Sequence, residues 1–126
     1  MTRGFHHIGL KTADIDKSLA FYAAIGGKEL YHFTMPSGRT IYMISLGEKS
    51  VIEIIPGKEG EAAPAAGWVH IALDTDNCDA AFDAAVAAGA AVQSAPEDKQ
   101  LGESGIFRLA FVEGPDGEVI EFSQKK

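Results

Sequence analysis

Two stretches decide the fold: "HIGLKTADIDKSLAFYAAIGG" at His7–Gly27 and "HIALDTDNCDAAFDAAVAAGA" at His70–Ala90. Aligned without gaps at an offset of 63 residues, they share His, Ile, Leu, Thr, Asp, Ala and Gly in register. Each begins as an alternating strand, passes through Asp or Asn residues suited to a helix N-cap, and continues as an amphipathic helix that ends at Gly26 or Gly89. The chain therefore repeats one strand–helix unit.

The segments after each predicted helix have strand character, with turn residues at Gly47–Lys49 and Gly114–Gly117. Each half is predicted to be a βαβββ module, which gives the α+β class. The segments are Lys28–Pro36, Thr40–Gly47 and Ser50–Gly57 in the first half, and Ala90–Pro96, Phe107–Gly117 and Glu118–Gln124 in the second.

The length of 126 residues suits one domain, expected to span residues 1–126. We expect a first module at 1–57, a linker at 58–67 and a second module at 68–126. The linker is rich in Gly, Ala and Glu, which is typical of a segment with little to pack.

Bulk charge and composition narrow the class of partner. The net charge of −7 gives no electrostatic reason to bind nucleic acid or an anionic membrane surface. The single cysteine, Cys78, excludes an internal disulfide, and neither a secretory h-region nor a membrane-spanning run is seen. We expect a cytoplasmic protein whose partner is a small molecule or another protein.

Two carboxylates, Glu53 and Glu121, interrupt otherwise apolar strands, both within the tripeptide Val-Ile-Glu. Because side chains alternate along a strand, Glu53 lies on the face opposite Ile52 and Ile54. The same alternation applies in the strands that contain His7, His70 and Glu121. If each helix covers the apolar stripe, four side chains face away from the helices: His7, Glu53, His70 and Glu121.

A glutamate near a strand end is most often solvated, and a lone strand histidine is most often structural. Their recurrence in both halves favours a shared function, because an unpaired buried carboxylate is costly. Two imidazoles and two carboxylates form a suitable ligand set for a divalent metal. His6 is excluded by parity, and only His7 matches His70 in register.

Four segments carry a resemblance to a known family: His6–Tyr22, Val51–Ile54, Val69–Asn77 and "AFVEGPDGEVIEF" at Ala110–Phe122. Together they resemble the vicinal oxygen chelate superfamily, which includes glyoxalase I, methylmalonyl-CoA epimerase, extradiol dioxygenases and bleomycin-resistance proteins. The resemblance implies two βαβββ modules whose sheets curl into a cup around a divalent metal.

The His, Glu, His, Glu pattern is most similar to that of bacterial-type glyoxalase I. This resemblance implies a lyase or isomerase that transfers a proton through a metal-stabilised enediolate of a small thiol hemithioacetal. It implies nickel, cobalt, zinc or manganese as the metal, held by His7, Glu53, His70 and Glu121, with Glu53 and Glu121 also catalytic. In similar small glyoxalases the modules pair across a homodimer, although pairing within one chain stays open.

Four cations are the candidates for binding an acidic group of the substrate: Lys11, Arg39, Lys99 and Arg108. Arg39 and Lys99 read equally well as solvated surface charges. Glutathione-using members carry an Asn-Trp stretch after the first Glu and an Arg at the place of Lys11, and this chain has neither. The polar segment Pro96–Gly105 is predicted to be a loop, either a lid or an inert surface loop.

Three alternatives remain. One is an epimerase and another a ring-cleaving dioxygenase of the same superfamily, the latter needing an open iron site rather than four protein ligands. The third is a non-catalytic binding or resistance protein, which has little need of a complete ligand set.

Overall fold

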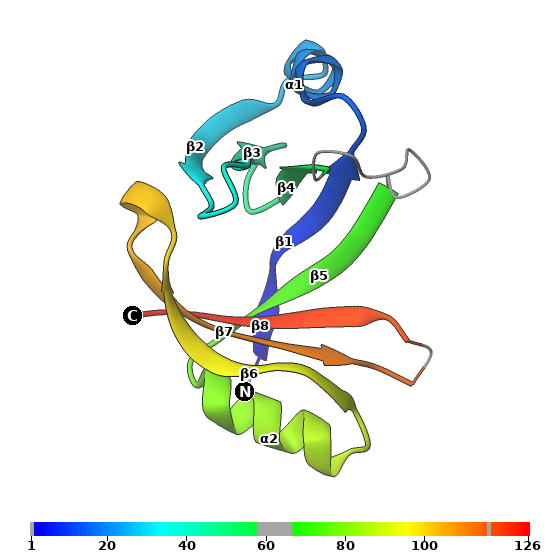
Figure 1. Cartoon of the computed structure of the whole chain (residues 1–126), viewed down its shortest axis with the longest axis vertical. Coiled ribbons are helices and arrows are strands. Elements are labelled where there is room, and N and C mark those ends of the chain that lie inside the picture. The colour runs from blue at the N-terminus through cyan, green and yellow to red at the C-terminus, as the bar shows by residue number, and fades with distance from the viewer. Residues whose placement is uncertain (1, 58–66, 116) are drawn as a thin grey trace. The chain divides into compact units, whose positions relative to one another are not determined.

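The computed structural model describes residues 2–57, 67–115 and 117–126. Contacts divide the chain into two compact units, one of His7–Val69 and one of Met1–His6 with His70–Lys126. The elements run in the order β1 (Thr2–Thr12), α1 (Ile15–Ala24), β2 (Lys28–Thr34), β3 (Thr40–Ser45), β4 (Val51–Pro56), β5 (Gly67–Thr75), α2 (Cys78–Ala87), β6 (Ala91–Gln100), a short 3-10 helix (Gly102–Ser104), β7 (Ile106–Glu113) and β8 (Val119–Lys125) (Figure 1).

In the unit His7–Val69 the strands lie in the order β2-β3-β4-β1. Strand β1 runs parallel to β4, whereas β2, β3 and β4 are joined by antiparallel pairing. Buried isoleucines of β3 and β4 pack against the apolar face of α1. The core comprises Ile44, Ile52 and Ile54, with Ile15, Leu19, Tyr22 and Tyr42 packed against it.

The other unit repeats this arrangement in the order β5-β8-β7-β6, with β5 parallel to β8. Its helix α2 lies along β6, β7 and β8 (Figure 1). The core comprises Cys78, Ala81, Ala110, Val112 and Phe122, with Leu73, Phe82, Ala85, Ala90 and Ile120 packed against it. The prediction of an α+β fold built from two βαβββ repeats is therefore confirmed.

Both helices begin and end as the sequence predicts. The Asp14 side chain accepts a hydrogen bond from the Lys17 amide, and the Asn77 side chain accepts one from the Ala80 amide. These bonds satisfy amides that a helix start would otherwise leave unpaired. Gly26 and Gly89, directly after the helices, have φ values of 100° and 103°, a region that costs other residues energy.

One predicted segment differs in the structure. The interpretation of Pro96–Gly105 as a loop is wrong over its first half, because β6 continues to Gln100. Residues 97–100 pair antiparallel with residues 106–109 of β7, and the polar composition that indicated a loop belongs to an edge strand. The register is irregular between Ser94 and Glu97, where Pro96 lies.

The predicted linker lies almost wholly outside the described residues, since residues 58–66 are not among them and Gly67 begins β5. The division of the chain at 1–57, 58–67 and 68–126 stays a prediction. Among the described residues, no helix is long and apolar enough to cross a lipid bilayer.

Candidate metal centre

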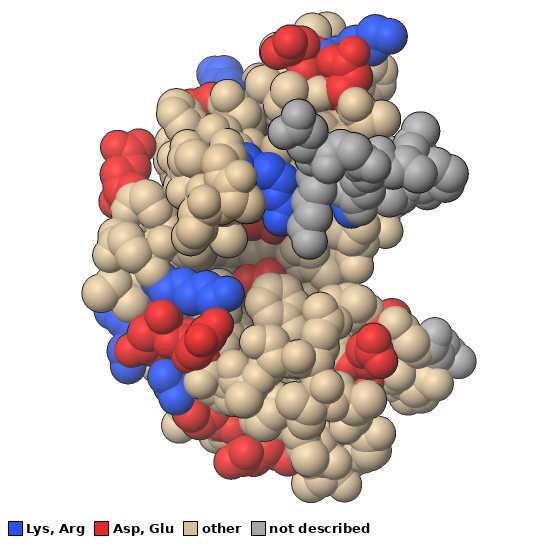
Figure 2. All heavy atoms as spheres, viewed as in Figure 1, with Lys and Arg blue, Asp and Glu red and all other residues tan. Residues whose placement is uncertain are grey.

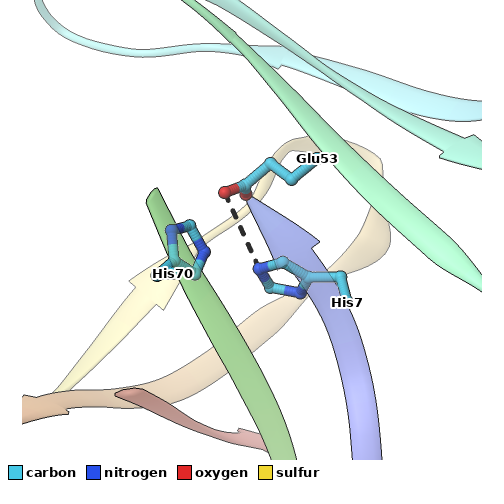
Figure 3. Close-up of side chains that lie close together, drawn as sticks. All are labelled: His7, Glu53 and His70. Carbon is cyan, nitrogen blue, oxygen red and sulfur yellow. Dashed lines mark ion pairs between the residues drawn. The ribbon is translucent and has the colours of Figure 1, made fainter. Parts of the chain in front are cut away.

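The unit His7–Val69 brings His7 of β1 and Glu53 of β4 together. In the parallel ladder Gly9 is the partner of Glu53, so His7, two residues earlier, is the diagonal neighbour of Glu53 on the same face. Figure 3 shows the two side chains pointing toward each other, with Nε2 of His7 3.6 Å from Oε1 of Glu53. The side chains are 4% and 13% exposed. This distance is longer than a hydrogen bond.

The other unit contains the same arrangement. Ala72 is the β5 partner of Glu121 on β8, so His70 is again two residues before the paired position. Its Nε2 lies 3.1 Å from Oε2 of Glu121, and the side chains are 9% and 5% exposed. The rings of Phe111 and His70 pack edge to face with their centroids 6.0 Å apart, and this contact restricts the orientation of the imidazole.

The repeat therefore builds one buried His–Glu pair in each unit, on the sheet face that the helix does not cover. An imidazole nitrogen and a carboxylate oxygen this close, both withdrawn from water, are the donor types that bind divalent metals such as nickel, cobalt, zinc and manganese. The donor set of these residues fits such a metal.

Ser123 on β8 is a member of the site face that the sequence did not single out. It lies two residues after Glu121 and is 1% exposed. Its Oγ has no hydrogen-bond partner among the residues that the structure describes. Parity alone could place Ser123 beside Glu121, but no sequence signal indicates that its hydroxyl is unsatisfied.

The four candidate substrate-binding cations lie in different surroundings. Lys11 is on β1 four residues after His7 and so shares its face. Lys99 is on β6, with its Nζ 3.2 Å from Oε1 of Glu97. Arg39 lies between β2 and β3, where it lines a pocket on the sheet face opposite the one that carries Glu53.

Arg108 is held in an ion-pair cluster that ties β7 to α2 and β6. It donates through Nε and Nη2 to Asp79 and through Nη1 to Asp98 at 3.0 Å. The hydrogen bonds from Arg108 lower the pKa of the Asp79 carboxyl, and the two carboxylates raise the pKa of the guanidinium. Substrate binding by these four cations stays a prediction.

On one face of the molecule, side chains of opposite charge lie among one another (Figure 2). On the face shown in Figure 2, Asp and Glu side chains lie among Lys and Arg side chains. The single thiol, Cys78, is fully buried at the start of α2, and burial raises its pKa from 9.0 to about 11. Cys78 therefore belongs to the core rather than to the site.

Comparisons with known proteins find similar sequences over nearly the whole chain. The sequence model described as the Glyoxalase/Bleomycin resistance protein/Dioxygenase superfamily matches residues 4–122. The uncharacterized protein YwbC of Bacillus subtilis (strain 168) is 34% identical, with 99% of this chain and 100% of that protein covered. Lactoylglutathione lyase of Neisseria meningitidis serogroup A is 32% identical, covering 95% of this chain and 89% of the lyase.

Among solved structures, methylmalonyl-CoA epimerase from Mycobacterium tuberculosis has a TM-score of 0.78 to this chain at 17% identity. The match covers 99% of this chain and 89% of the epimerase. At this identity the likeness shows the fold alone.

Proposed function

Because the chain belongs to the glyoxalase/bleomycin resistance protein/dioxygenase superfamily, we propose that it is a divalent-metal-dependent lyase of the glyoxalase I type. Its substrate would be the hemithioacetal of a small thiol, and its reaction the transfer of a proton between adjacent carbons. The observation that carries the proposal is the buried His–Glu pair found in both units. The relationship to a lactoylglutathione lyase over nearly the whole chain supports it.

The metal would be held by His7, Glu53, His70 and Glu121, and nickel, cobalt, zinc or manganese suits this donor set. When bound, it would polarise the adjacent oxygen atoms of the substrate and lower the energy of the enediolate. Proton transfer and binding of the acidic group of the substrate would be the work of side chains of this chain.

Glu121 is the main candidate for the base that moves the proton, with Glu53 as its counterpart in the other unit. The carboxylate of Glu121 is nearly buried and its Oε2 lies within hydrogen-bond distance of Nε2 of His70, which fixes its orientation. A positioned base with little competing water transfers a proton more readily than a solvated one. Lys11, on the same face as His7, would attract an acidic group of the substrate.

We also propose that the working form is a homodimer. Each unit by itself carries one His and one Glu, so a site with four protein ligands needs two units, from one chain or from two. In the dimer, His7 and Glu53 of one subunit would meet the other pair from its partner.

The first experiment measures metal content and turnover together. Protein stripped with EDTA is reloaded separately with nickel and with zinc, and bound metal is quantified by mass spectrometry. Activity is then assayed with methylglyoxal and either glutathione or another small thiol. We expect bound metal and turnover in the native protein, and loss of both in His7→Ala and His70→Ala.

His32→Ala is the matched control. Its Nδ1 lies 3.1 Å from Oε2 of Glu29, so it also forms a His–Glu pair, but on an exposed part of β2. Unchanged metal content in both site variants would refute the metal centre. Absence of turnover with every thiol in both metal forms would exclude the lyase, and epimerase substrates or oxygen consumption by an iron form would then be tested.

A further inference from the structure

A pocket of about 570 Å³ lies in the unit His7–Val69, on the sheet face opposite Glu53. Its walls include Ile15 at the start of α1, Tyr42 of β3, Pro56 at the end of β4, and Arg39. Tyr42 is the partner of Ile54, whereas Glu53 is paired with Met43, so Tyr42 and Glu53 point to opposite faces. The pocket is therefore separate from the His7–Glu53 pair.

At the corresponding place in the other unit, side chains of β7 and β8 bind the start of α2. Gln124, which corresponds to Pro56 in the repeat, accepts a hydrogen bond through Oε1 from the Cys78 amide at 2.9 Å. Arg108, the β7 partner of Gln124, binds Asp79 on the first turn of α2. At the equivalent position of β4, Pro56 has no side-chain acceptor to offer α1. The two repeats thus differ in how the strands contact the helix start at this place.

The guanidinium of Arg39 is positioned at this pocket by neutral groups. Its Nη1 donates to the Pro56 carbonyl at 3.3 Å and its Nε donates to Ser37 Oγ at 3.4 Å. Within the described residues no carboxylate is paired with Arg39, in contrast to the two that neutralise Arg108. A fixed and uncompensated guanidinium favours a carboxylate or phosphate.

We propose that this pocket is a second ligand site, which binds a small organic anion. The carboxylate or phosphate of the ligand binds Arg39, and its apolar part packs against Tyr42, Ile15 and Pro56. The volume is within the range of small-molecule sites, where apolar walls and a few polar groups share the work of recognition. This inference stands independently of the lyase proposal, because it uses neither the metal ligands nor the face on which they lie.

The test is an NMR titration of the nitrogen-15-labelled protein with benzoate and, separately, with phenyl phosphate, up to about 10 mM. Saturable shifts are expected at the amides of Ser37–Thr40 and Tyr42, and benzyl alcohol, which has the same ring without the charge, should bind at least about tenfold more weakly. Saturation by only one of the two anions would identify the head group that the site accepts. If neither anion produced saturable shifts at these amides, the proposal would be overturned.

The matched variants are Arg39→Gln and Lys49→Gln, which remove the same charge from the same unit. Lys49 is exposed in the turn between β3 and β4 and does not line the pocket. We expect Arg39→Gln to weaken benzoate binding by about tenfold or more, and Lys49→Gln to change it by less than about twofold. Equal affinity in the native protein and in Arg39→Gln would contradict the assignment.

Arg39→Lys provides a second variant, should the Gln variant give the spectrum of an unfolded protein. A lysine keeps the charge but loses the planar fork, so affinity between that of the native protein and that for benzyl alcohol is expected. Affinity for benzoate no higher in Arg39→Lys than the native affinity for benzyl alcohol would overturn the role of charge.

Discussion

The two His–Glu pairs differ in geometry, and that difference predicts unequal costs when each carboxylate is replaced by an amide. Glu121→Gln converts a charge-assisted hydrogen bond of 3.1 Å in a nearly dry site into a neutral one. Hydrogen bonds to charged groups contribute about 1.5–3 kcal/mol and neutral ones about 0.5–1.5 kcal/mol, so the metal-free protein should lose about 1–1.5 kcal/mol of stability. Glu53→Gln acts on a pair 3.6 Å apart, so the part of its cost that comes from the contact with His7 should be smaller.

The assay is urea unfolding followed by circular dichroism, in EDTA, with the free energy of unfolding compared at equal slope. Glu29→Gln is the control for burial, because its pair with His32 is also 3.1 Å apart but about half exposed, and it should cost almost nothing. A loss in Glu29→Gln equal to that in Glu121→Gln would refute the reasoning. With zinc at about 100 times its Kd, the native protein should gain about 2.7 kcal/mol, and both site variants should lose most of that gain.

Three further predictions follow from single features. Burial raises the pKa of Cys78 in the folded protein from 9.0 to about 11, so the thiol of the unfolded chain ionises at lower pH. The free energy of unfolding should therefore fall by about 2–3 kcal/mol as the pH rises from 9 to above 11. Urea unfolding of Cys78→Ala at the same pH values should lack this decrease. Ser123→Ala removes an unsatisfied buried hydroxyl and should raise the free energy of unfolding by about 1 kcal/mol, whereas a loss of that size would show that Oγ has a partner. Sedimentation should give twice the chain mass for the metal-loaded protein, and a monomer with full metal content would contradict the cross-subunit site.

Local patterns in the sequence were enough to predict the α+β fold with its βαβββ repeat and to place His7, Glu53, His70 and Glu121 on the face away from the helices. The N-caps Asp14 and Asn77 and the end glycines are short-range signals. Strand parity gives the face on which His7 and Glu53 lie, whereas the structure supplies the parallel register that brings them together. These features depend on neighbours within a few residues or on a copy of the same pattern.

The features that the sequence did not predict arise from contacts between distant residues. Arg108 reaches Asp79, 29 positions away, and nothing local distinguishes it from a free substrate-binding cation. The last residues of β6 are polar, and their sequence resembles a loop. They form a strand because their backbone pairs with β7. The pocket beside Arg39 is lined by Pro56, whereas Gln124 at the equivalent position of the second repeat binds the Cys78 amide, a contact that the sequence alone does not show.

The two ends of strand β1 belong to different units, and this affects both folding and the design of variants. Arg3 hydrogen-bonds to the Thr75 carbonyl and pairs with Asp74, and the His6 ring meets Phe107. Because Arg3 and Thr75 lie 72 positions apart, the unit that contains His70–Lys126 closes through contacts of large sequence separation, which form slowly during folding. A change in the first part of β1, such as Arg3→Ala, is therefore expected to destabilise the unit of His70–Lys126 rather than the unit His7–Val69.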